Sequence, residues 1–305
     1  MPAFDWPLTA FTLITQLVLG AFAVLWVTDQ AARHLARPEE QEYLTRVGVW
    51  LLGPLMAVGF AVSMLHLGQP MFAFRALSNP ATSWLSREIL SLGAFFVLGG
   101  GYALLWWRWQ DKFALRASYG AVVAVVGAVG LVSMVGLYLL PAMPTWNNVA
   151  TPLAFVASAL LLGPVLVAAV FTVTYGRHHD QDALRPLIRQ HLGYMAVTVL
   201  VGAVLAGAAL AIQLAMLPRL GLEGEASLAL LTSEHVVLFG GRVAMLLAAV
   251  ALAALVLRQV ARSATLQGTP AMVWGLFAVV AASELLGRLL FYASAVPVRP
   301  PDAFF

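Results

Sequence analysis

The sequence predicts an all-α membrane protein: a polytopic bundle of eight transmembrane helices in a single domain, residues 1–305. Hydrophobic residues make up 61% of the chain and charged residues only 10%, and the mean hydropathy is +0.88. That is too little charge to cover the surface of a water-soluble domain. Apolar stretches long enough to cross a bilayer, which takes about 20 residues, recur along the whole chain.

The connections between these stretches are short, so no segment remains for a separate soluble domain. The N-terminal MPAFDWPLTAF has no basic region typical of a cleavable signal, and the first span is expected to stay in the membrane. Acidic clusters containing serine open the third and seventh spans, which hints at a 4 + 4 duplication. The predicted spans are 8–29, 45–67, 84–107, 117–140, 150–175, 191–217, 232–257 and 270–293.

Basic residues predict the orientation of the bundle. The loops after odd-numbered spans, with their flanks, contain eleven Arg and Lys residues, whereas the other loops and the tails contain three. Cytoplasmic loops carry the excess of positive charge. We therefore expect the odd loops in the cytoplasm and both termini on the outer, periplasmic side.

The side-chain inventory restricts the chemistry of this chain. There are no cysteines, which excludes disulfides, thiolate-held iron–sulfur clusters and cysteine nucleophiles here. Of the six histidines, only His66 and His235 fall in one predicted layer, and no pair lies at opposite depths of the bilayer. We expect neither haem nor metal in this chain.

Ionisable residues gather at the predicted outer ends of at least four spans. Such groups are costly at membrane depth and are functional suspects by default. Glu284 and Arg288 have the i, i+4 spacing of a structural salt bridge, and Arg242 could pair with Glu284. Glu234 and His235 could simply cap a helix end. The layer comprises His66, Ser86, Arg87, Glu88, Glu234, His235, Arg242, Glu284 and Arg288.

His66 and Glu88 bracket a loop rich in Pro, Gly and aromatic residues, and on spacing alone they could equally be interfacial groups facing water. Histidine titrates near neutral pH and exchanges protons, and a carboxylate beside it could relay them. A lipid-soluble quinone would suit such a layer between apolar helices. A secondary transporter is the alternative, although its ionisable groups usually lie nearer the bilayer midplane.

Four patches of the sequence resemble the membrane anchor subunit of anaerobic dimethyl sulfoxide reductase. The most specific is SMLHLGQPMFAFRALSNPATSWLSREIL at 63–90, in which His-Leu-Gly is followed about twenty residues later by Ser-x-Glu-Ile. The others are DWPLTAFTLITQLVLGAF at 5–22, PTWNNVATPLAF at 144–155 and SELLGRLLFY at 283–292. Together they cover about a quarter of the chain.

This resemblance implies a multi-pass protein of the bacterial inner membrane that anchors a molybdenum catalytic subunit and an iron–sulfur subunit. It implies menaquinol oxidation near the outer face, no haem or metal in the anchor, and no nucleic-acid partner. By analogy, His66 and Glu88 would handle protons in the quinol site, with Gly68, Ser86 and Arg87 from the same motif around the quinol. The chemistry of the terminal substrate would belong to another chain.

Two departures from the family pattern stand in this motif. Gln69 occupies a position where a small hydroxyl residue is expected, and Arg87 replaces an uncharged residue. A cation at position 87 could stabilise ionised Glu88 and alter the preference between menaquinone and ubiquinone. The same fold also serves sulfite-oxidising and polysulfide-reducing complexes, so the direction of electron flow stays open. A purely structural anchor is a further alternative.

Overall fold

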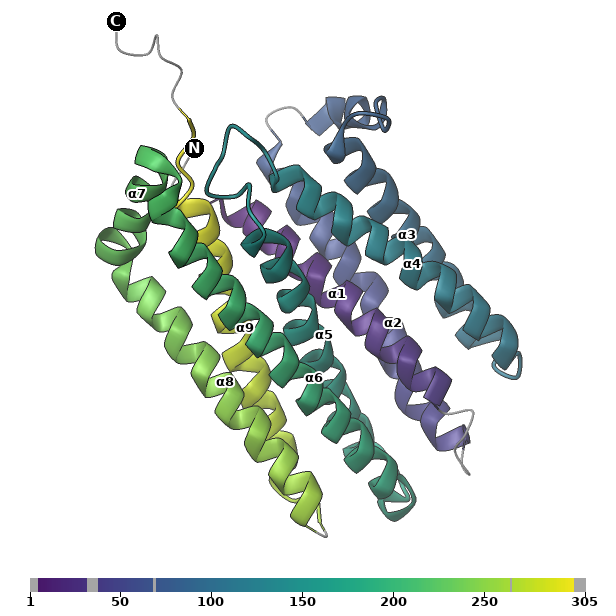
Figure 1. Cartoon of the computed structure of the whole chain (residues 1–305). Coiled ribbons are helices and arrows are strands. Elements are labelled where there is room, and N and C mark those ends of the chain that lie inside the picture. Colours follow the sequence, from purple (N-terminus) through teal and green to yellow (C-terminus); the bar gives the residue numbers. More distant parts are fainter. Residues whose placement is uncertain (1–4, 32–37, 68–69, 264, 299–305) are drawn as a thin grey trace, which may run out of the picture.

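The computed structural model describes residues 5–31, 38–67, 70–263 and 265–298. Within these ranges the secondary structure is helical, and eight helices are long and apolar enough to cross a membrane, which confirms the predicted fold class. The α-helices are α1 (Trp6–Ala31), α2 (Pro38–Ser63), α3 (Trp84–Arg108), α4 (Phe113–Tyr138), α5 (Ala150–Arg177), α6 (Gln181–Met216), α7 (Gly221–Ala229), α8 (Val236–Arg262) and α9 (Thr269–Ala293) (Figure 1).

Two helices begin well before the predicted spans. Helix α6 starts at Gln181, ten residues ahead of its apolar stretch, because Asp180 caps it by accepting a hydrogen bond from the Ala183 backbone at 3.0 Å. Helix α2 starts at Pro38, and Glu39 and Glu40 lie in its first turn, where acidic residues are favoured. Hydropathy detects only the part of a helix that suits lipid, whereas capping sets where the helix begins.

The connections contain short elements that the hydropathy pattern does not predict. A 3₁₀ turn (Met64–His66) and a 3₁₀ helix (Pro70–Leu77) lie between α2 and α3. Between α6 and α8 lie a 3₁₀ turn (Leu217–Arg219), α7 and a π-helical turn (Leu230–Glu234). All are too short to give a span-length apolar signal.

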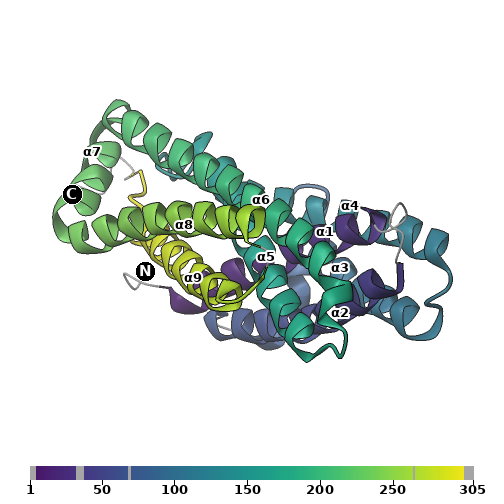
Figure 2. The ribbon, with the colours of Figure 1, turned by 90° about the horizontal axis from the view of Figure 1, so that it is seen from below.

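Helices α1 and α5 form the middle of the bundle, and α5 has the largest buried share among the spans. The α8–α9 pair packs on one side and the α3–α4 pair on the other, which gives an elongated cross-section (Figures 1 and 2). Gly20 of α1 lies against α5 so closely that a Cβ there would be 2.1 Å from the Ala159 carbonyl oxygen. Small residues permit this backbone-to-backbone packing in membranes.

The two ends of the bundle differ. We call the end that contains Trp6 and Ala293 the proximal end; it also carries the α2–α3, α4–α5 and α6–α8 connections (Figure 1). The other end, with the α3–α4 and α5–α6 turns, is the distal end. The predicted outer layer of ionisable residues corresponds to the proximal end. Which membrane face each end meets stays a prediction from the basic residues.

Candidate functional site

The first turn of α3 lies at the proximal end and is fixed to the preceding loop. Ser83 caps the helix by accepting a hydrogen bond from the Ser86 backbone at 3.3 Å. The buried Ser86 hydroxyl donates to the Ala76 carbonyl, in the 3₁₀ helix of the loop. Ser86, expected beside a quinol, therefore makes its hydrogen bond with the loop and holds that loop against α3.

Arg87 turns back onto the same loop. Its Nε donates to the Pro80 carbonyl at 2.8 Å, and Nη2 donates to the Ala81 carbonyl. Its guanidinium lies 4.4 Å from the centre of the Trp84 ring. These contacts direct the Arg87 charge toward the loop carbonyls, so its observed role is to brace the α2–α3 connection rather than to form a salt bridge with Glu88.

Glu88 points into the bundle and is only 4% exposed. None of the described side chains forms a salt bridge with its carboxylate. The hydroxyls of Tyr138 on α4 and Tyr292 on α9 hydrogen bond to each other at 2.6 Å. A buried carboxyl group without a cationic partner is a candidate for proton exchange.

Aromatic rings surround the two tyrosines. Trp146, from the α4–α5 connection, stacks on Phe291 with ring centroids 5.1 Å apart, and its indole N–H donates to the Phe291 carbonyl at 2.9 Å. The Tyr138 ring contacts both of them and Phe155. Two patches of the sequence, at 144–155 and 283–292, thus meet at the proximal end.

The other two members of the motif are located less fully. The backbone of His66 belongs to the 3₁₀ turn that follows α2, at the same end of the bundle as Glu88. Its side chain and the whole of Gly68 lie outside the described residues. The proximity of His66 to Glu88 therefore stays a prediction.

Glu284 and Arg288 do not form the predicted salt bridge with each other among the described contacts. Ser158 on α5 donates its hydroxyl hydrogen to Glu284 Oε2. Arg288 Nη2 donates to Gln16 Oε1 on α1 at 2.9 Å, and the guanidinium lies 3.9 Å from the Phe155 ring centre. The i, i+4 spacing puts both side chains on one face of α9. Each of them instead contacts a polar side chain on a neighbouring helix, α5 for Glu284 and α1 for Arg288.

The guanidinium of Arg242 on α8 lies against Gly287 of α9. A Cβ on Gly287 would be 2.7 Å from the Arg242 Cζ atom, so a larger residue there would displace this side chain. None of the described salt bridges joins Arg242 to Glu284. The predicted pairing of these two residues is therefore not observed.

A buried ionic cluster at the distal end is absent from the sequence-based expectations. Arg116, in the first turn of α4, is fully buried and contacts Asp29 of α1 at 3.3 Å and Glu42 of α2 at 2.8 Å. Its guanidinium lies 4.1 Å from the Trp106 ring centre. The distribution of basic residues places Arg116 in a loop. The acidic Asp29 at the end of an apolar span does indicate that a cation lies nearby within the bundle. This cluster joins three helices.

No group of three His, Asp or Glu side chains within the described ranges is arranged to hold a metal ion. The protonatable side chains near this end, Glu88, Tyr138 and Tyr292, belong to α3, α4 and α9.

Comparison with known proteins identifies the family of this chain. The family model described as "DMSO reductase anchor subunit (DmsC)" matches residues 1–294. Anaerobic dimethyl sulfoxide reductase chain YnfH of Escherichia coli (strain K12) is 34% identical over 170 residues, which is 54% of this chain and 57% of that protein. An anaerobic dimethyl sulfoxide reductase chain of Haemophilus influenzae is 27% identical over 197 residues, 65% of this chain and 69% of that protein.

A further relative is a subunit of a different enzyme. A sulfite dehydrogenase subunit of Allochromatium vinosum is 36% identical over 118 residues, 36% of each chain. The chain spans a little over half the length of the Escherichia coli relatives that it matches. The family model nevertheless covers all eight spans. The chain therefore belongs to the DMSO reductase anchor subunit family.

Proposed function

We propose that this chain anchors a molybdenum and iron–sulfur oxidoreductase of the dimethyl sulfoxide reductase type in the bacterial inner membrane, and that it oxidises menaquinol at its proximal end. The observation that carries the proposal is Glu88. Its carboxyl group is buried at the start of α3 and has no salt-bridge partner among the described residues. Family membership supports the anchoring role.

Quinol oxidation releases two electrons and two protons, and the proposal gives the protons to this chain. Glu88 accepts one proton from a quinol hydroxyl and passes it to water beyond the loop. His66, on the opposite side of the connection, accepts the other. Arg87 and Ser86 hold the loop in place through their bonds to its carbonyls, so they position the site without exchanging protons.

The electrons pass to an iron–sulfur cluster of a partner subunit. Because no haem is expected in this chain, quinol and partner have to share one end of the bundle. The α2–α3 connection exposes apolar side chains there: Met71 is 84% exposed and Phe74 63% exposed. Exposed apolar residues near a bundle end are candidates for protein contact, and we assign them to the docking of the iron–sulfur subunit.

Purification of the full chain from its native membrane in mild detergent tests the proposal. We expect an iron–sulfur subunit and a molybdenum subunit to copurify, with both metals present and with menaquinol-dependent reduction of dimethyl sulfoxide. A protein that purifies alone, contains no metal and transports a solute in proteoliposomes would contradict the proposal and favour a transporter.

The match to a sulfite dehydrogenase subunit supports a second candidate, in which the same site reduces quinone with electrons from sulfite. The same preparation separates the two. Sulfite-dependent quinone reduction without dimethyl sulfoxide reduction would favour the second candidate, whereas the reverse pattern favours the first. Both candidates use Glu88 as the proton-exchanging group.

A further inference from the structure

A groove lined by α1, α4, α5 and α6 opens on the outside of the bundle. Its volume is about 480 Å³, within the range of about 300–1,000 Å³ typical of small-molecule sites. Two residues of its wall, Val27 on α1 and Tyr194 on α6, are 56% and 58% exposed. Because the helices around the groove are long and apolar enough to span a bilayer, the medium that meets this opening is lipid.

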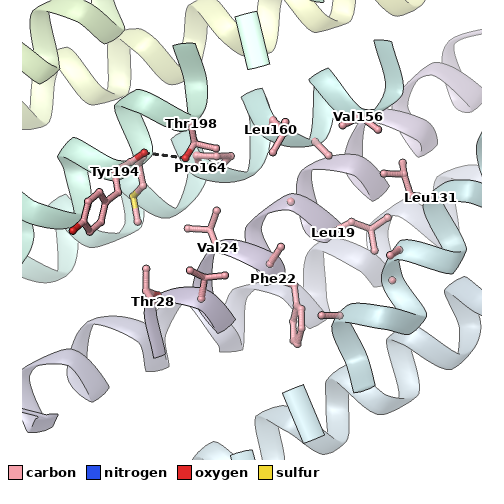
Figure 3. A pocket seen from close by; sticks show the side chains of 18 of the residues that line it. Leu19, Phe22, Val24, Thr28, Leu131, Val156, Leu160, Pro164, Tyr194 and Thr198 are labelled. Carbon is pink, nitrogen blue, oxygen red and sulfur yellow. Dashed lines mark hydrogen bonds between the residues drawn. The ribbon is translucent and has the colours of Figure 1, made fainter. Parts of the chain in front are cut away.

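The groove extends from the distal end of the bundle into its middle. Along α1 the wall runs from Leu19, halfway along the helix, to Ala31, the last residue of the helix. At about 1.5 Å per residue this stretch covers about 18 Å, and one leaflet contributes about 15 Å to the hydrocarbon core of a bilayer. Figure 3 shows Leu131 and Tyr194 at opposite ends of the wall. The groove therefore has the length and the depth of a single leaflet.

The wall offers apolar surface and no charge. Its described residues include no Lys, Arg, Asp or Glu. The hydroxyl groups of Thr28 and Thr198 each donate at 2.9 Å to a backbone carbonyl of their own helix (Figure 3), and His191 Nε2 shares a hydrogen bond with Gln41 Oε1 on α2. A quinone ring has oxygens that accept hydrogen bonds, and these two hydroxyl hydrogens are already used. A plain hydrocarbon chain makes no such demand on the wall.

The extent of the groove also argues against a second protein. A transmembrane helix crosses both leaflets of a bilayer, whereas no described lining residue of α1 comes before Leu19. An acyl chain of a phospholipid starts at one interface and ends near the middle of the bilayer, as the groove does. Its direction therefore favours a lipid chain over a helix of a partner or of a second copy.

The distal mouth of the groove carries a group that suits the polar part of a lipid. Tyr194 lies at the start of the apolar stretch of α6, residues 191–217, which is the depth where tyrosine is enriched in membrane proteins. Its hydroxyl accepts a hydrogen bond from the Gln190 amide at 3.0 Å, and its own hydrogen is not donated in any of the described hydrogen bonds. The ester carbonyls of a phospholipid lie at this depth and accept hydrogen bonds.

We propose that this groove binds one phospholipid of the distal leaflet. One acyl chain lies along α1 from Ala31 toward Leu19, and a glycerol ester accepts a hydrogen bond from the Tyr194 hydroxyl. The lipid fills the space between α4 and α6 and is retained as part of the bundle instead of exchanging with the surrounding bilayer. The proposal does not depend on Glu88 or on the direction of electron flow.

Two photoreactive phospholipids test the occupant and its direction. Each is a phosphatidylethanolamine with a diazirine in one acyl chain, close to the ester in one probe and close to the methyl end in the other. The full chain would be loaded with one equivalent of probe, washed in mild detergent and irradiated, and mass spectrometry would locate the label. We expect the ester-side probe to label α6 around Tyr194 and the methyl-end probe to label α1 and α4 around Leu19 and Leu131. The reverse pattern, or no retained probe, would overturn the proposal.

Matched variants distinguish the groove from ordinary contact with lipid. Ala128 and Val129 are both exposed on α4, but only Ala128 lines the groove. Ala128→Phe should abolish the label and Val129→Phe should preserve it; Thr198→Phe, which fills the groove from α6, should also abolish it. Tyr194→Phe should lower retention of the lipid about threefold, as for one lost hydrogen bond. A label that survives both groove-filling variants would come from surrounding lipid and would overturn the proposal.

Competition separates a phospholipid from a quinone. A tenfold excess of a naphthoquinone with an isoprenoid tail should leave the methyl-end label unchanged, whereas loss of that label would show that the groove prefers the quinone and would overturn the phospholipid assignment. Glu88→Gln should also leave the label unchanged. Failure of the proposed quinol site would therefore not alter this result, and failure of the lipid site would not alter menaquinol oxidation at Glu88.

Discussion

Arg116 and Glu88 are both buried residues that can carry charge, but their surroundings suit different roles. Arg116 is surrounded by Asp29, Glu42 and the Trp106 ring, an arrangement in which its charge is compensated in place. Glu88 is also buried, yet no described side chain forms a salt bridge with it. Compensated charge stabilises a bundle, whereas an uncompensated carboxyl group is available for proton exchange.

Replacement of Glu88 by glutamine should abolish most quinol oxidation while the bundle stays folded. Glutamine has nearly the same shape but accepts no proton at neutral pH, and loss of a general base typically costs about 10²–10⁴-fold in rate. Menaquinol-dependent turnover of the purified complex is the measurement. Glu225→Gln, an exposed acid on α7 at the same end, is the matched control. Turnover within about twofold of the unmodified complex would show that Glu88 takes no proton in the rate-limiting chemistry.

Replacement of Arg116 by methionine should destabilise the chain strongly. It removes the buried guanidinium that contacts both Asp29 and Glu42, and breaking a buried ion pair costs about 3–5 kcal/mol. The midpoint of unfolding in detergent reports the loss. The double variant Asp29→Asn with Arg116→Met should recover part of it, because the buried negative charge that Arg116 compensates is then also removed. A single variant as stable as the unmodified chain would contradict the structural role.

At the scale of elements, helix limits follow the capping residues and helix contacts follow the small residues. Asp180 sets the start of α6 well before its apolar stretch. Gly20 and Gly163 let α1 and α5 touch through their backbones at the centre of the bundle. The loop before α3 is held by Ser86 and Arg87 through three carbonyl groups. These hydrogen bonds thus fix the start of α3 to the α2–α3 connection.

The close packing at Gly20 predicts that replacing a glycine by leucine will disturb the bundle at position 20 but not at position 207. Gly20→Leu should prevent α1 from packing on α5, because even a Cβ would overlap the Ala159 carbonyl. Gly207→Leu should have little effect, since nothing lies within 4 Å of a Cβ there. Yield and monodispersity of the two variants in mild detergent are the readouts. Equal yields would contradict the backbone contact between the two helices.

At the scale of the whole molecule, the proximal end contains the site, the exposed apolar loop, the start of α1 and the end of α9 (Figure 1). The eight spans among the described residues bring these two helix ends to one face. The basic residues of the distal turns predict that this face is the outer one. A quinol site and its electron-accepting partner would then share the periplasmic side.

Single cysteines can test that orientation cleanly, because the chain has none of its own. Glu225→Cys lies on α7 at the proximal end, and Asp111→Cys lies in the exposed α3–α4 turn at the distal end. A membrane-impermeant maleimide should react with position 225 in intact spheroplasts and with position 111 only after lysis. The opposite pattern would reverse the orientation and place the proposed site in the cytoplasm.

The fold class, the eight spans and the motif that contains Glu88 could be predicted from the sequence. The length of an apolar segment and the spacing of charges are local properties of the chain, and the bilayer admits only apolar helices of sufficient length. Which charges meet depends on the tertiary structure. Glu284 and Arg288 bind Ser158 and Gln16 instead of each other, Arg87 binds the loop, and Arg116 is buried with Asp29. Partners on other helices depend on how the spans rotate and pack, and periodicity along one helix does not contain that information.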